Sequence, residues 1–495
     1  MIIVLGAGVV GVLVEAFVPR RPRHAVQVGI ALLALVAALV QVVRLRDTEI
    51  IGAVGSVAID GPALFLQGTL LVMAIISVMF FAERRIESGG NAFAPAASSL
   101  PGSEDERVLV RDRVLQTEIY PLTMFSVGGM MLFPAANDLL VMFIALEVLS
   151  LPLYLLCGMA RRRRLLSQEA AMKYFLLGAF ASGFFLFGAA FVYGYAGSLE
   201  FAAIDAALAA RVGQEGLLLA GVGLMAVGLL FKIGAVPFHA WTPDVYQGAP
   251  SQVTAFMAAC TKIAAFGAML RLFYVAFGGI RTDWQPMLWA VAIITMVVGI
   301  VVALTQTDVK RMLAYSSIAH AGFILTALVA VDEVAIAAIL FYLAAYGLTT
   351  LGAFAVVTLV RDAGGEATHL SKWAGLGKRS PLLAATFGLF LLALAGIPLT
   401  SGFVGKLTVF AAAFQGGAMP LVIVGVVTSA VAAFFYVRVI VLMFFSDPAP
   451  EGPTVAVPSA WTVVGIGAAV VATIVLGILP GPLLELAEQA AVFVR

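Results

Sequence analysis

The residues of this sequence that could do chemistry are a few charged side chains placed inside long apolar runs. Lys232 and Lys262 both lie in the stretch FKIGAVPFHAWTPDVYQGAPSQVTAFMAACTK, and neither has an acidic neighbour in sequence. A lysine near the middle of a bilayer costs about 2.5–3.5 kcal/mol on insertion scales. Ionisable residues kept at such a cost usually mark ion or proton pathways, so these two lysines are the first candidate site residues.

Glu147 and Lys406 are two further charges in apolar surroundings. Glu147 lies near the centre of NDLLVMFIALEVLSLPLYLLCGM, and Lys406 follows the break AGIPLTSG. A buried carboxylate is either neutral or paired with a cation, and Lys232 is the partner we expect for Glu147. A structural salt bridge without turnover is the alternative interpretation of Glu147.

Two histidines and one more lysine are weaker candidates for the same site. His320, in KRMLAYSSIAHAGF, has hydroxyl residues about one turn away, and imidazole titrates near neutrality, which suits a proton relay. A hydrogen-bonded structural histidine fits His320 equally well. His239, at the broken end of its apolar run, could load protons or cap the helix. Lys173 could join the relay, or it could extend to the membrane interface like Arg271 and Arg438, which lie within about two turns of span ends.

The composition identifies the class of protein that must hold these residues. Of 495 residues, 62% are hydrophobic and 12% are charged, against about 25% charged in ordinary soluble domains. We therefore expect an all-α integral membrane protein that contacts the lipid bilayer and no nucleic acid. Cys157 and Cys260 lack the spacing of an iron–sulfur or zinc site, so we expect no metal and no cofactor in this chain. The motif GxGxxG at Gly6 lies in a membrane-length run and is explained by helix packing rather than by a nucleotide.

Apolar runs separated by breakers predict fourteen membrane spans. The segment 83–117, rich in Gly, Pro, Ser and mixed charge, is expected to be a mobile polar loop. The runs 216–240 and 380–414 are interrupted by GAVPFH and AGIPLTSG. The spans lie near 2–18, 24–43, 61–82, 118–135, 137–159, 167–196, 216–240, 250–277, 286–306, 309–330, 334–360, 380–414, 419–446 and 460–485.

The distribution of basic residues predicts the orientation in the membrane. Cytoplasmic loops are enriched in Lys and Arg, and both termini on the outer side place most basic loop residues in the cytoplasm. The cytoplasmic set is then Arg20, Arg21, Arg23, Arg84, Arg85, Arg107, Arg111, Arg113, Arg161, Arg162, Arg163, Arg164, Lys310, Arg311, Arg361, Lys372, Lys378 and Arg379. The outer set is Arg44, Arg46, Arg211, Arg281 and Arg495.

The two interrupted spans occupy matching places in two successive groups of five spans. Units with an odd number of spans insert upside down relative to each other, which gives an inverted repeat with broken helices near an ion site. The expected organisation is three N-terminal spans and a polar loop in 1–117, the first repeat in 118–277, the second repeat in 286–446, and a C-terminal span in 447–495.

Three motifs carry a family resemblance that covers nearly the whole chain. FKIGAVPFHAWTPDVYQGAPSQVTAF, DVKRMLAYSSIAHAGF and AGIPLTSGFVGK resemble the antiporter-like membrane subunits of respiratory complex I, the proton-translocating NADH:quinone oxidoreductase. WTPDVYQGAP, together with a length of 495 residues and no C-terminal extension, is most similar to the N-type of these subunits.

This resemblance implies roles for individual residues. The family has fourteen helices and is thought to have one proton channel per subunit, with an essential glutamate on the fifth helix that matches Glu147. Its lysines on the sixth helix, the broken seventh helix and the eighth helix match Lys173, Lys232 and Lys262. The lysine after the twelfth-helix break matches Lys406.

The resemblance also implies a setting for the chain. The subunit would lie in a bacterial plasma membrane beside sister antiporter-like subunits, and it would act as the non-redox, proton-translocating part of an enzyme. NAD, FMN, iron–sulfur clusters and quinone would be bound by partner subunits. We expect a proton to pass from the cytoplasm to Lys232, then to Lys262 and His320, and outward by Lys406. Subunits of cation/proton antiporters and of membrane-bound hydrogenase-type complexes have the same helix pattern and are the alternatives, whereas a purely structural scaffold would not explain the deep charges.

Overall fold

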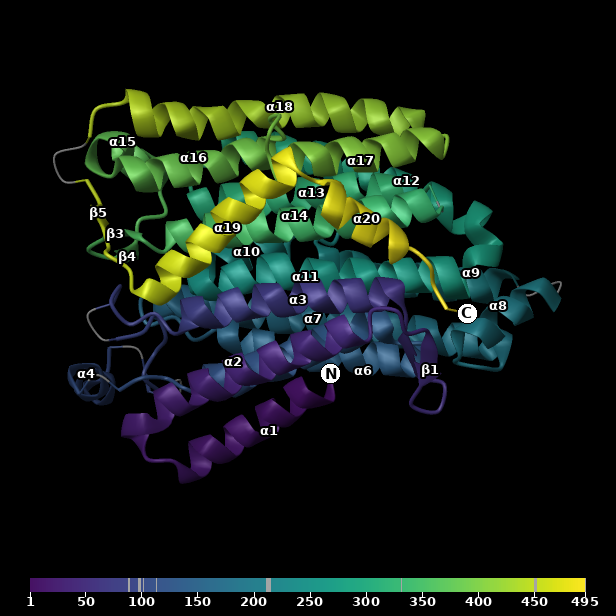
Figure 1. Ribbon diagram of the computed structural model, residues 1–495, viewed down its shortest axis with the longest axis horizontal. Coiled ribbons are helices and arrows are strands. Elements are labelled where there is room, and N and C mark those ends of the chain that lie inside the picture. The colour runs from purple at the N-terminus through teal and green to yellow at the C-terminus, as the bar shows by residue number, and fades with distance from the viewer. Residues whose placement is uncertain are drawn as a thin grey trace.

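The computed structural model is a bundle of helices that run in roughly one direction between two ends formed by loops (Figure 1). It describes residues 1–87, 90–96, 99–100, 102–112, 114–210, 215–330, 332–448 and 452–494. Ten helices in these ranges are long and apolar enough to cross a membrane. The prediction of a mainly helical, multi-pass membrane protein is confirmed. Arg113, Arg211 and Arg495, used above for the orientation, lie outside the described residues.

The N-terminal part contains three apolar helices, a β-hairpin and a short helix of the 83–117 segment. In the hairpin, Ile50 pairs with Ile59 in an antiparallel register. The elements are α1 (Ile2–Phe17), α2 (Arg20–Arg44), β1 (Ile50–Gly52), β2 (Val57–Ile59), α3 (Gly61–Phe81) and α4 (Glu104–Arg111).

The next part contains the run predicted to be the first interrupted span, where α9 ends at Ile233 and α10 begins at Trp241. Its elements are α5 (Ile119–Leu132), η1 (Phe133–Ala135), α6 (Leu139–Cys157), α7 (Arg164–Ala196), α8 (Phe201–Ala210), α9 (Glu215–Ile233), α10 (Trp241–Gly248), α11 (Ser251–Arg271), η2 (Leu272–Ala276) and η3 (Gly278–Ile280).

The C-terminal part contains the run predicted to be the second interrupted span, where α16 ends at Ala395 and α17 begins at Ser401, and a small sheet with strand order β4-β3-β5. Its elements are α12 (Arg281–Thr305), α13 (Val309–Leu328), α14 (Glu333–Val357), β3 (Val360–Asp362), β4 (Gly365–Glu366), η4 (Leu370–Trp373), α15 (Leu376–Arg379), α16 (Pro381–Ala395), α17 (Ser401–Gln415), α18 (Met419–Phe445), β5 (Thr454–Val455), α19 (Ala460–Ile478) and α20 (Gly481–Gln489).

The two ends of the bundle are formed by different elements. One end, here called the basic face, carries α4, α15 and the β3–β5 sheet, at the left of Figure 1. The other end, here called the hairpin face, carries β1, α8 and the C-terminus, at the right of the same view.

Aspartates at the starts of four helices accept hydrogen bonds from first-turn amides, which offsets the unpaired donors of a helix N-terminus. They are Asp60 of α3, Asp138 of α6, Asp308 of α13 and Asp332 of α14.

The centre of the bundle is formed around α11, in which every residue is buried. A helix that is buried on all sides must lie between other helices, and α11 packs against α3, α13 and α14. Lys262 is on this helix, so its position follows directly from the packing of the bundle.

Arg271, at the end of α11, corrects the expectation that it extends to the membrane interface. Its side chain is fully buried and pairs with Asp60, with Nη2 2.6 Å from Oδ1 and 2.7 Å from Oδ2. Its Nε donates to the carbonyl of Pro134 at 2.7 Å. The packing of α3 beside α11 supplies the carboxylate, which no spacing in the sequence indicates. Arg438 is exposed, in agreement with its predicted place at the interface.

The 83–117 segment, expected to be a mobile loop, packs against distant parts of the basic face where it is described. Glu83 accepts hydrogen bonds from the amide and hydroxyl of Ser459 and from the hydroxyl of Thr462, each at 2.7 Å. Glu87 pairs with Arg162 at 3.2 Å and with Arg361. The segment therefore joins the N-terminal helices to the second half of the chain.

Candidate functional site

Lys232 lies in the last turn of α9 and is 2% exposed. Its Nζ donates to Ser150 Oγ of α6 at 2.7 Å and to Tyr174 Oη of α7 at 3.1 Å. The same nitrogen is 5.2 Å from the centre of the Tyr174 ring. Three helices thus meet at this ammonium, and its partners are hydroxyl groups that can donate as well as accept.

Glu147, the partner expected for Lys232, forms no ion pair with it in the described part of the chain, where the lysine donates to hydroxyls instead. The buried Oε1 of Glu147 has no hydrogen-bond partner among the described residues. Ser150 stands three residues further along α6, on the same side of the helix, and takes the place beside the lysine. The structure brings Glu147 to the neighbourhood of Lys232 through a shared helix face rather than through a bond.

The non-helical segment between α9 and α10 positions this lysine. Gly234 has φ +74°, a conformation that residues with a Cβ rarely adopt, and it ends the helix. Trp241 Nε1 donates to the freed carbonyl of Phe231 at 2.9 Å, and Val236 donates to Thr295 Oγ1 at 3.0 Å. The break is therefore closed by hydrogen bonds. Beyond it, His239 is half-buried, and its buried Nδ1 has no partner among the described residues.

Lys262 occupies the middle of the buried helix α11 and is 2% exposed. Its Nζ donates to the carbonyl of Ser317 on α13. It also lies 5.9 Å from the ring centre of Tyr346 on α14, a cation–π distance. The hydroxyls of Ser317 and Tyr346 are buried and make no hydrogen bond within the described chain, so both retain donor and acceptor capacity next to the lysine.

His320 is linked to Lys262 through Tyr346. It lies on α13 one turn beyond Ser317, and its ring centre is 4.9 Å from that of Tyr346. His320 Nδ1 is 2.6 Å from Tyr342 Oη, and Nε2 is 3.5 Å from Tyr436 Oη. The histidine is 3% exposed and contacts a hydroxyl at each ring nitrogen, an arrangement that allows a proton to pass through the ring.

Lys406 lies on α17 at the second chain break and is 6% exposed. Its Nζ donates to the carbonyls of Leu394 at 3.0 Å and Ala395 at 2.8 Å, and to Ser429 Oγ at 2.8 Å. The two carbonyls belong to the last turn of α16, where the helix dipole favours a cation. The prediction that Lys406 lies deep in the protein at a broken span agrees with this geometry.

A small cavity lies between His320 and the non-helical segment that separates α16 from α17. It has a volume of about 10 Å³, close to the least that holds one water molecule. Its lining includes His320, Tyr342, Thr349, Leu394 and Ser401. Because Leu394 also accepts a hydrogen bond from Lys406, this cavity completes a line of contacts from Lys262 to Lys406.

Lys173 is in a different setting from the other lysines. Its Nζ is 2.7 Å from Glu169 Oε1 and 2.7 Å from Asp244 Oδ2, and its side chain is 42% exposed. Asp244 also binds Arg311 at 2.7 Å. Lys173 therefore belongs to a charged network that joins α7, α10 and α13, and it lies apart from the deep lysines.

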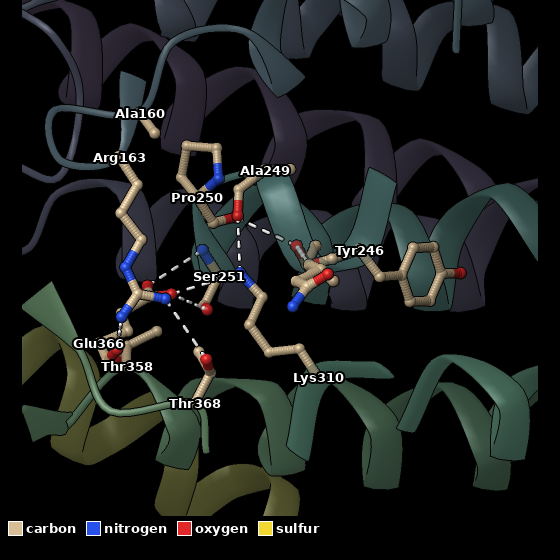
Figure 2. Close-up of polar contacts among 12 residues, drawn as sticks. Ala160, Arg163, Tyr246, Ala249, Pro250, Ser251, Lys310, Thr358, Glu366 and Thr368 are labelled. Carbon is tan, nitrogen blue, oxygen red and sulfur yellow. Dashed lines mark hydrogen bonds and ion pairs between the residues drawn. The ribbon is translucent and has the colours of Figure 1, made fainter. Parts of the chain in front are cut away.

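A second buried lysine site on the basic face was not anticipated from the sequence, where Lys310 was expected to be a loop residue. Figure 2 shows Lys310 donating to the carbonyl of Ala249 at 2.7 Å and to Glu366 Oε2 at 3.2 Å. Ser251 binds the same carboxylate, and Arg163 reaches the Glu366 carbonyl at 3.1 Å. Burial opposes ionisation of Glu366, yet the Lys310 charge and the Ser251 hydroxyl hold its pKa below the usual range.

The residues missed by sequence reasoning are hydroxyls and one ion pair. Ser150, Tyr174, Tyr342, Tyr346 and Ser429 look like ordinary helix residues in sequence, and only their contacts with the lysines or the histidine single them out. The described residues contain no group of three or more His, Cys, Asp or Glu side chains arranged to hold a metal ion. What the site contains is a set of groups able to hold and transfer protons.

Comparisons with known proteins agree with one another. Residues 136–432 match the family model described as NADH:quinone oxidoreductase/Mrp antiporter, TM. A relative from Rhodococcus opacus (strain B4), named NADH-quinone oxidoreductase subunit N, is 62% identical, and the match covers 100% of this chain and 95% of the relative.

Two solved structures have the same fold. A chain of respiratory complex I from Thermus thermophilus with bound Aureothin has a TM-score of 0.79 at 34% identity. The match covers 98% of this chain and 99% of that chain. A chain of the Mrp complex from Dietzia sp. DQ12-45-1b has a TM-score of 0.80 at 21% identity, covering 99% and 96%, and at that identity it shows the fold alone. The full-length identity to named relatives, the family model and the shared fold place this chain in the family of NADH-quinone oxidoreductase subunit N, an antiporter-like membrane subunit of respiratory complex I.

Proposed function

We propose that this chain translocates protons across a membrane as a non-redox subunit of NADH:quinone oxidoreductase. The proton path consists of Lys232, Lys262, His320 and Lys406, with Glu147 modulating the charge of Lys232. NADH oxidation by quinone takes place in partner subunits, which bind NAD, FMN and the iron–sulfur clusters. The relatives named as subunit N support this assignment over a cation/proton antiporter or a hydrogenase-type complex.

The observation that carries the proposal is the line of contacts between Lys262 and Lys406. Lys262 faces the Tyr346 ring, the Tyr346 ring lies tilted against that of His320, and His320 shares a cavity with Leu394. The Leu394 carbonyl then accepts a hydrogen bond from Lys406. Protons move along hydrogen-bonding groups, and this line crosses a core in which other polar groups are sparse.

Lys232 is separated by a gap from Lys262, the first residue of that line. None of the hydrogen bonds of the described residues joins them, although both are buried. We propose that transfer across the gap is the controlled step, opened when Glu147 and Lys232 change their separation. A carboxylate moving toward Lys232 would favour its charged form, and moving away would favour release of the proton.

The surroundings of Glu147 support a partner subunit as the source of that change. On α6, Leu140, Ile144, Leu151 and Leu155 are exposed at helical spacing, and half-buried Glu147 lies beside this stripe. A carboxylate in the middle of a span is not stable against lipid, so the stripe fits a neighbouring membrane subunit of the complex, such as a sister antiporter-like subunit.

The proposal includes the architecture and orientation expected from the sequence. α9 with α10 and α16 with α17 are counted as two interrupted spans, which gives fourteen passes. The units 118–277 and 286–446 are proposed as inverted repeats, flanked by 1–117 and 447–495. The clustering of Arg162, Arg361 and Lys310 on the basic face supports a cytoplasmic position for that face of a bacterial plasma membrane. Both termini would then lie on the outer side.

Replacing Lys262 by alanine tests the function directly. The complex carrying Lys262→Ala, purified and reconstituted in vesicles, should lose proton translocation driven by NADH, because the middle acceptor of the line is removed. Cys260→Ala, on the same buried helix but outside the line, should retain coupled translocation. Full retention of coupled proton movement in Lys262→Ala would remove this lysine from the path.

The same vesicles distinguish the alternative. Proton movement that requires a Na⁺ gradient and does not respond to NADH would assign the chain to a cation/proton antiporter.

A further inference from the structure

A large apolar groove lies on the outside of the bundle, and part of its floor is formed by α14, the helix that also carries Tyr346. Its volume is about 1070 Å³, at the upper end of the ~300–1,000 Å³ found for ligand clefts. It lies between α2, α3 and α14 on one side and α19 and α20 on the other. Figure 1 shows α19 and α20 crossing the bundle obliquely above α2 and α3.

The groove is deep and open to the surroundings of the bundle. Met73 and Ala344, in its lining, are 0% and 4% exposed, whereas Val43 of α2 and Val471 of α19 are each 60% exposed. The lining is therefore a buried floor between two exposed apolar walls. In a membrane such a groove is filled by lipid or by another protein, because water does not occupy the hydrocarbon region.

The length of the groove distinguishes these two occupants. Its α3 lining runs from Gly61 to Met73, about 18 Å of helix at about 1.5 Å per residue. This is little more than half of the ~30 Å hydrocarbon core, so the groove extends through about one leaflet from the hairpin face. The acyl chains of one lipid have that reach, whereas a transmembrane helix would need a groove along the whole core.

The charges at the hairpin-face end of the groove indicate the headgroup. Arg46, Asp47, Thr48 and Glu49 line this end between α2 and the hairpin, and Gln489 lines it from α20. Arg46 and Asp47 are exposed and pair with each other, with Arg46 Nε 3.1 Å from Asp47 Oδ2, so a headgroup would meet a cation and an anion side by side. One guanidinium binds a phosphate well, and two carboxylates bind a primary ammonium. A purely anionic headgroup meets more acidic than basic groups here, and lipids of that kind are recognised by clusters of several lysines or arginines.

We propose that this groove binds one zwitterionic, amine-bearing phospholipid of the ethanolamine type from the leaflet at the hairpin face. Arg46 binds the phosphate, Asp47 and Glu49 bind the ammonium, and the acyl chains lie on the floor between α3 and α14. The lipid fills the space between α2 and α19 and so joins the two ends of the chain. Neither the proton path nor the family comparisons assign a ligand to this groove.

Native mass spectrometry of the purified full-length chain, after delipidation and addition of defined lipids, tests the proposal. Phosphatidylethanolamine should be retained more strongly than phosphatidylglycerol, which lacks the ammonium, and than phosphatidylcholine, whose ammonium has no N–H donor. Arg46→Ala should weaken phosphatidylethanolamine binding about tenfold, as expected for loss of a charge-assisted hydrogen bond. Arg44→Ala, at an exposed arginine outside the groove, should leave binding unchanged.

A second pair of variants tests the apolar part of the groove. Ala472→Trp places a bulky ring in the lining and should reduce retention of phosphatidylethanolamine, whereas Val463→Trp, at an exposed position of α19 outside the lining, should not. Equal retention of the three lipids together with no effect of Arg46→Ala would overturn the proposal.

A photo-crosslinking amino acid at Val471 in the intact complex identifies the occupant without relying on a destabilised variant. Adducts to phospholipid support the lipid site, and an adduct to another protein chain would show that the groove is a subunit interface instead.

Discussion

Lys232 and Lys406 differ in the groups that surround their ammonium ions. The hydrogen-bond partners of Lys232 among the described residues are the hydroxyls of Ser150 and Tyr174, and a hydroxyl can satisfy either the charged or the neutral amine. Lys406 contacts two backbone carbonyls, which only accept, and one hydroxyl, that of Ser429. The surroundings of Lys232 therefore suit both forms of the amine, whereas those of Lys406 favour the charged form more strongly.

This difference predicts unequal effects of removing each hydroxyl. Ser150→Ala takes away one of the two partners of Lys232 and should slow NADH-driven proton translocation about tenfold, the effect of about 1.4 kcal/mol on a barrier. Ser429→Ala leaves Lys406 with both carbonyls and should slow it less. The rates of acidification in vesicles at equal NADH oxidation check this. An equal loss in both variants would contradict the distinction between the two lysines.

The interrupted helices determine where these lysines sit. α9 ends at Gly234, whose positive φ turns the chain away, and α10 begins only at Trp241. A Cβ at residue 234 would also lie 2.8 Å from Thr242 Oγ1. The break thus depends on one residue that has no side chain.

Gly234→Ala should therefore destabilise the first break by about 1–3 kcal/mol, the range for a strained backbone, and displace Lys232. Gly223→Ala on the same helix α9 has open space at the Cβ position and a helical backbone, so it should be neutral or slightly stabilising. Melting temperatures of the purified chain in detergent and coupled proton translocation measure the two consequences. A Gly234→Ala chain as stable and active as Gly223→Ala would show that the break does not need this conformation.

At the scale of the whole molecule, buried ion pairs hold distant parts of the chain together. Arg271 with Asp60 joins α11 to the N-terminal helices at the hairpin face, and Glu366 with Lys310 joins the β3–β5 sheet to α13 at the basic face. Removing one member of a buried pair leaves the other charge without compensation, which is more damaging than the absence of the pair.

Arg271→Met should accordingly lower the stability of the folded chain by about 3–5 kcal/mol. The double variant Arg271→Met with Asp60→Asn should recover part of that loss, because the isolated carboxylate is also removed. Arg44→Met, at an exposed arginine, should change the melting temperature little. A double variant that is no more stable than the single one would show that the pair is not the source of the effect.

The pair at the basic face predicts a pH dependence. The pKa of Glu366 is below its unfolded value of 4.5, so the carboxylate contributes stability above that pH and loses it as the pH falls through the lower folded value. The melting temperature of the chain should therefore fall more steeply below pH 4.5 than that of Glu366→Gln. Parallel curves for the two proteins in this range would contradict the prediction.

The sequence by itself determined the class of fold and indicated the main candidate site residues. An apolar composition, the repeated runs and the breaks at Gly234 and Pro398 required a multi-pass helical protein, and the cost of burying charge singled out Glu147, Lys232, Lys262 and Lys406. These inferences hold because membrane burial penalises every charge individually, whatever the tertiary arrangement.

The tertiary structure alone decided which groups surround those charges. Lys232 donates a hydrogen bond to Ser150 rather than to Glu147, Arg271 proved to be paired rather than extended to the interface, and Lys310 proved to be buried. Each partner comes from a helix or strand distant in sequence. The residues around a serine, a tyrosine or a loop aspartate form no local sequence pattern from which its contact could be predicted. Helix packing brings such groups together, and packing depends on all the helices at once.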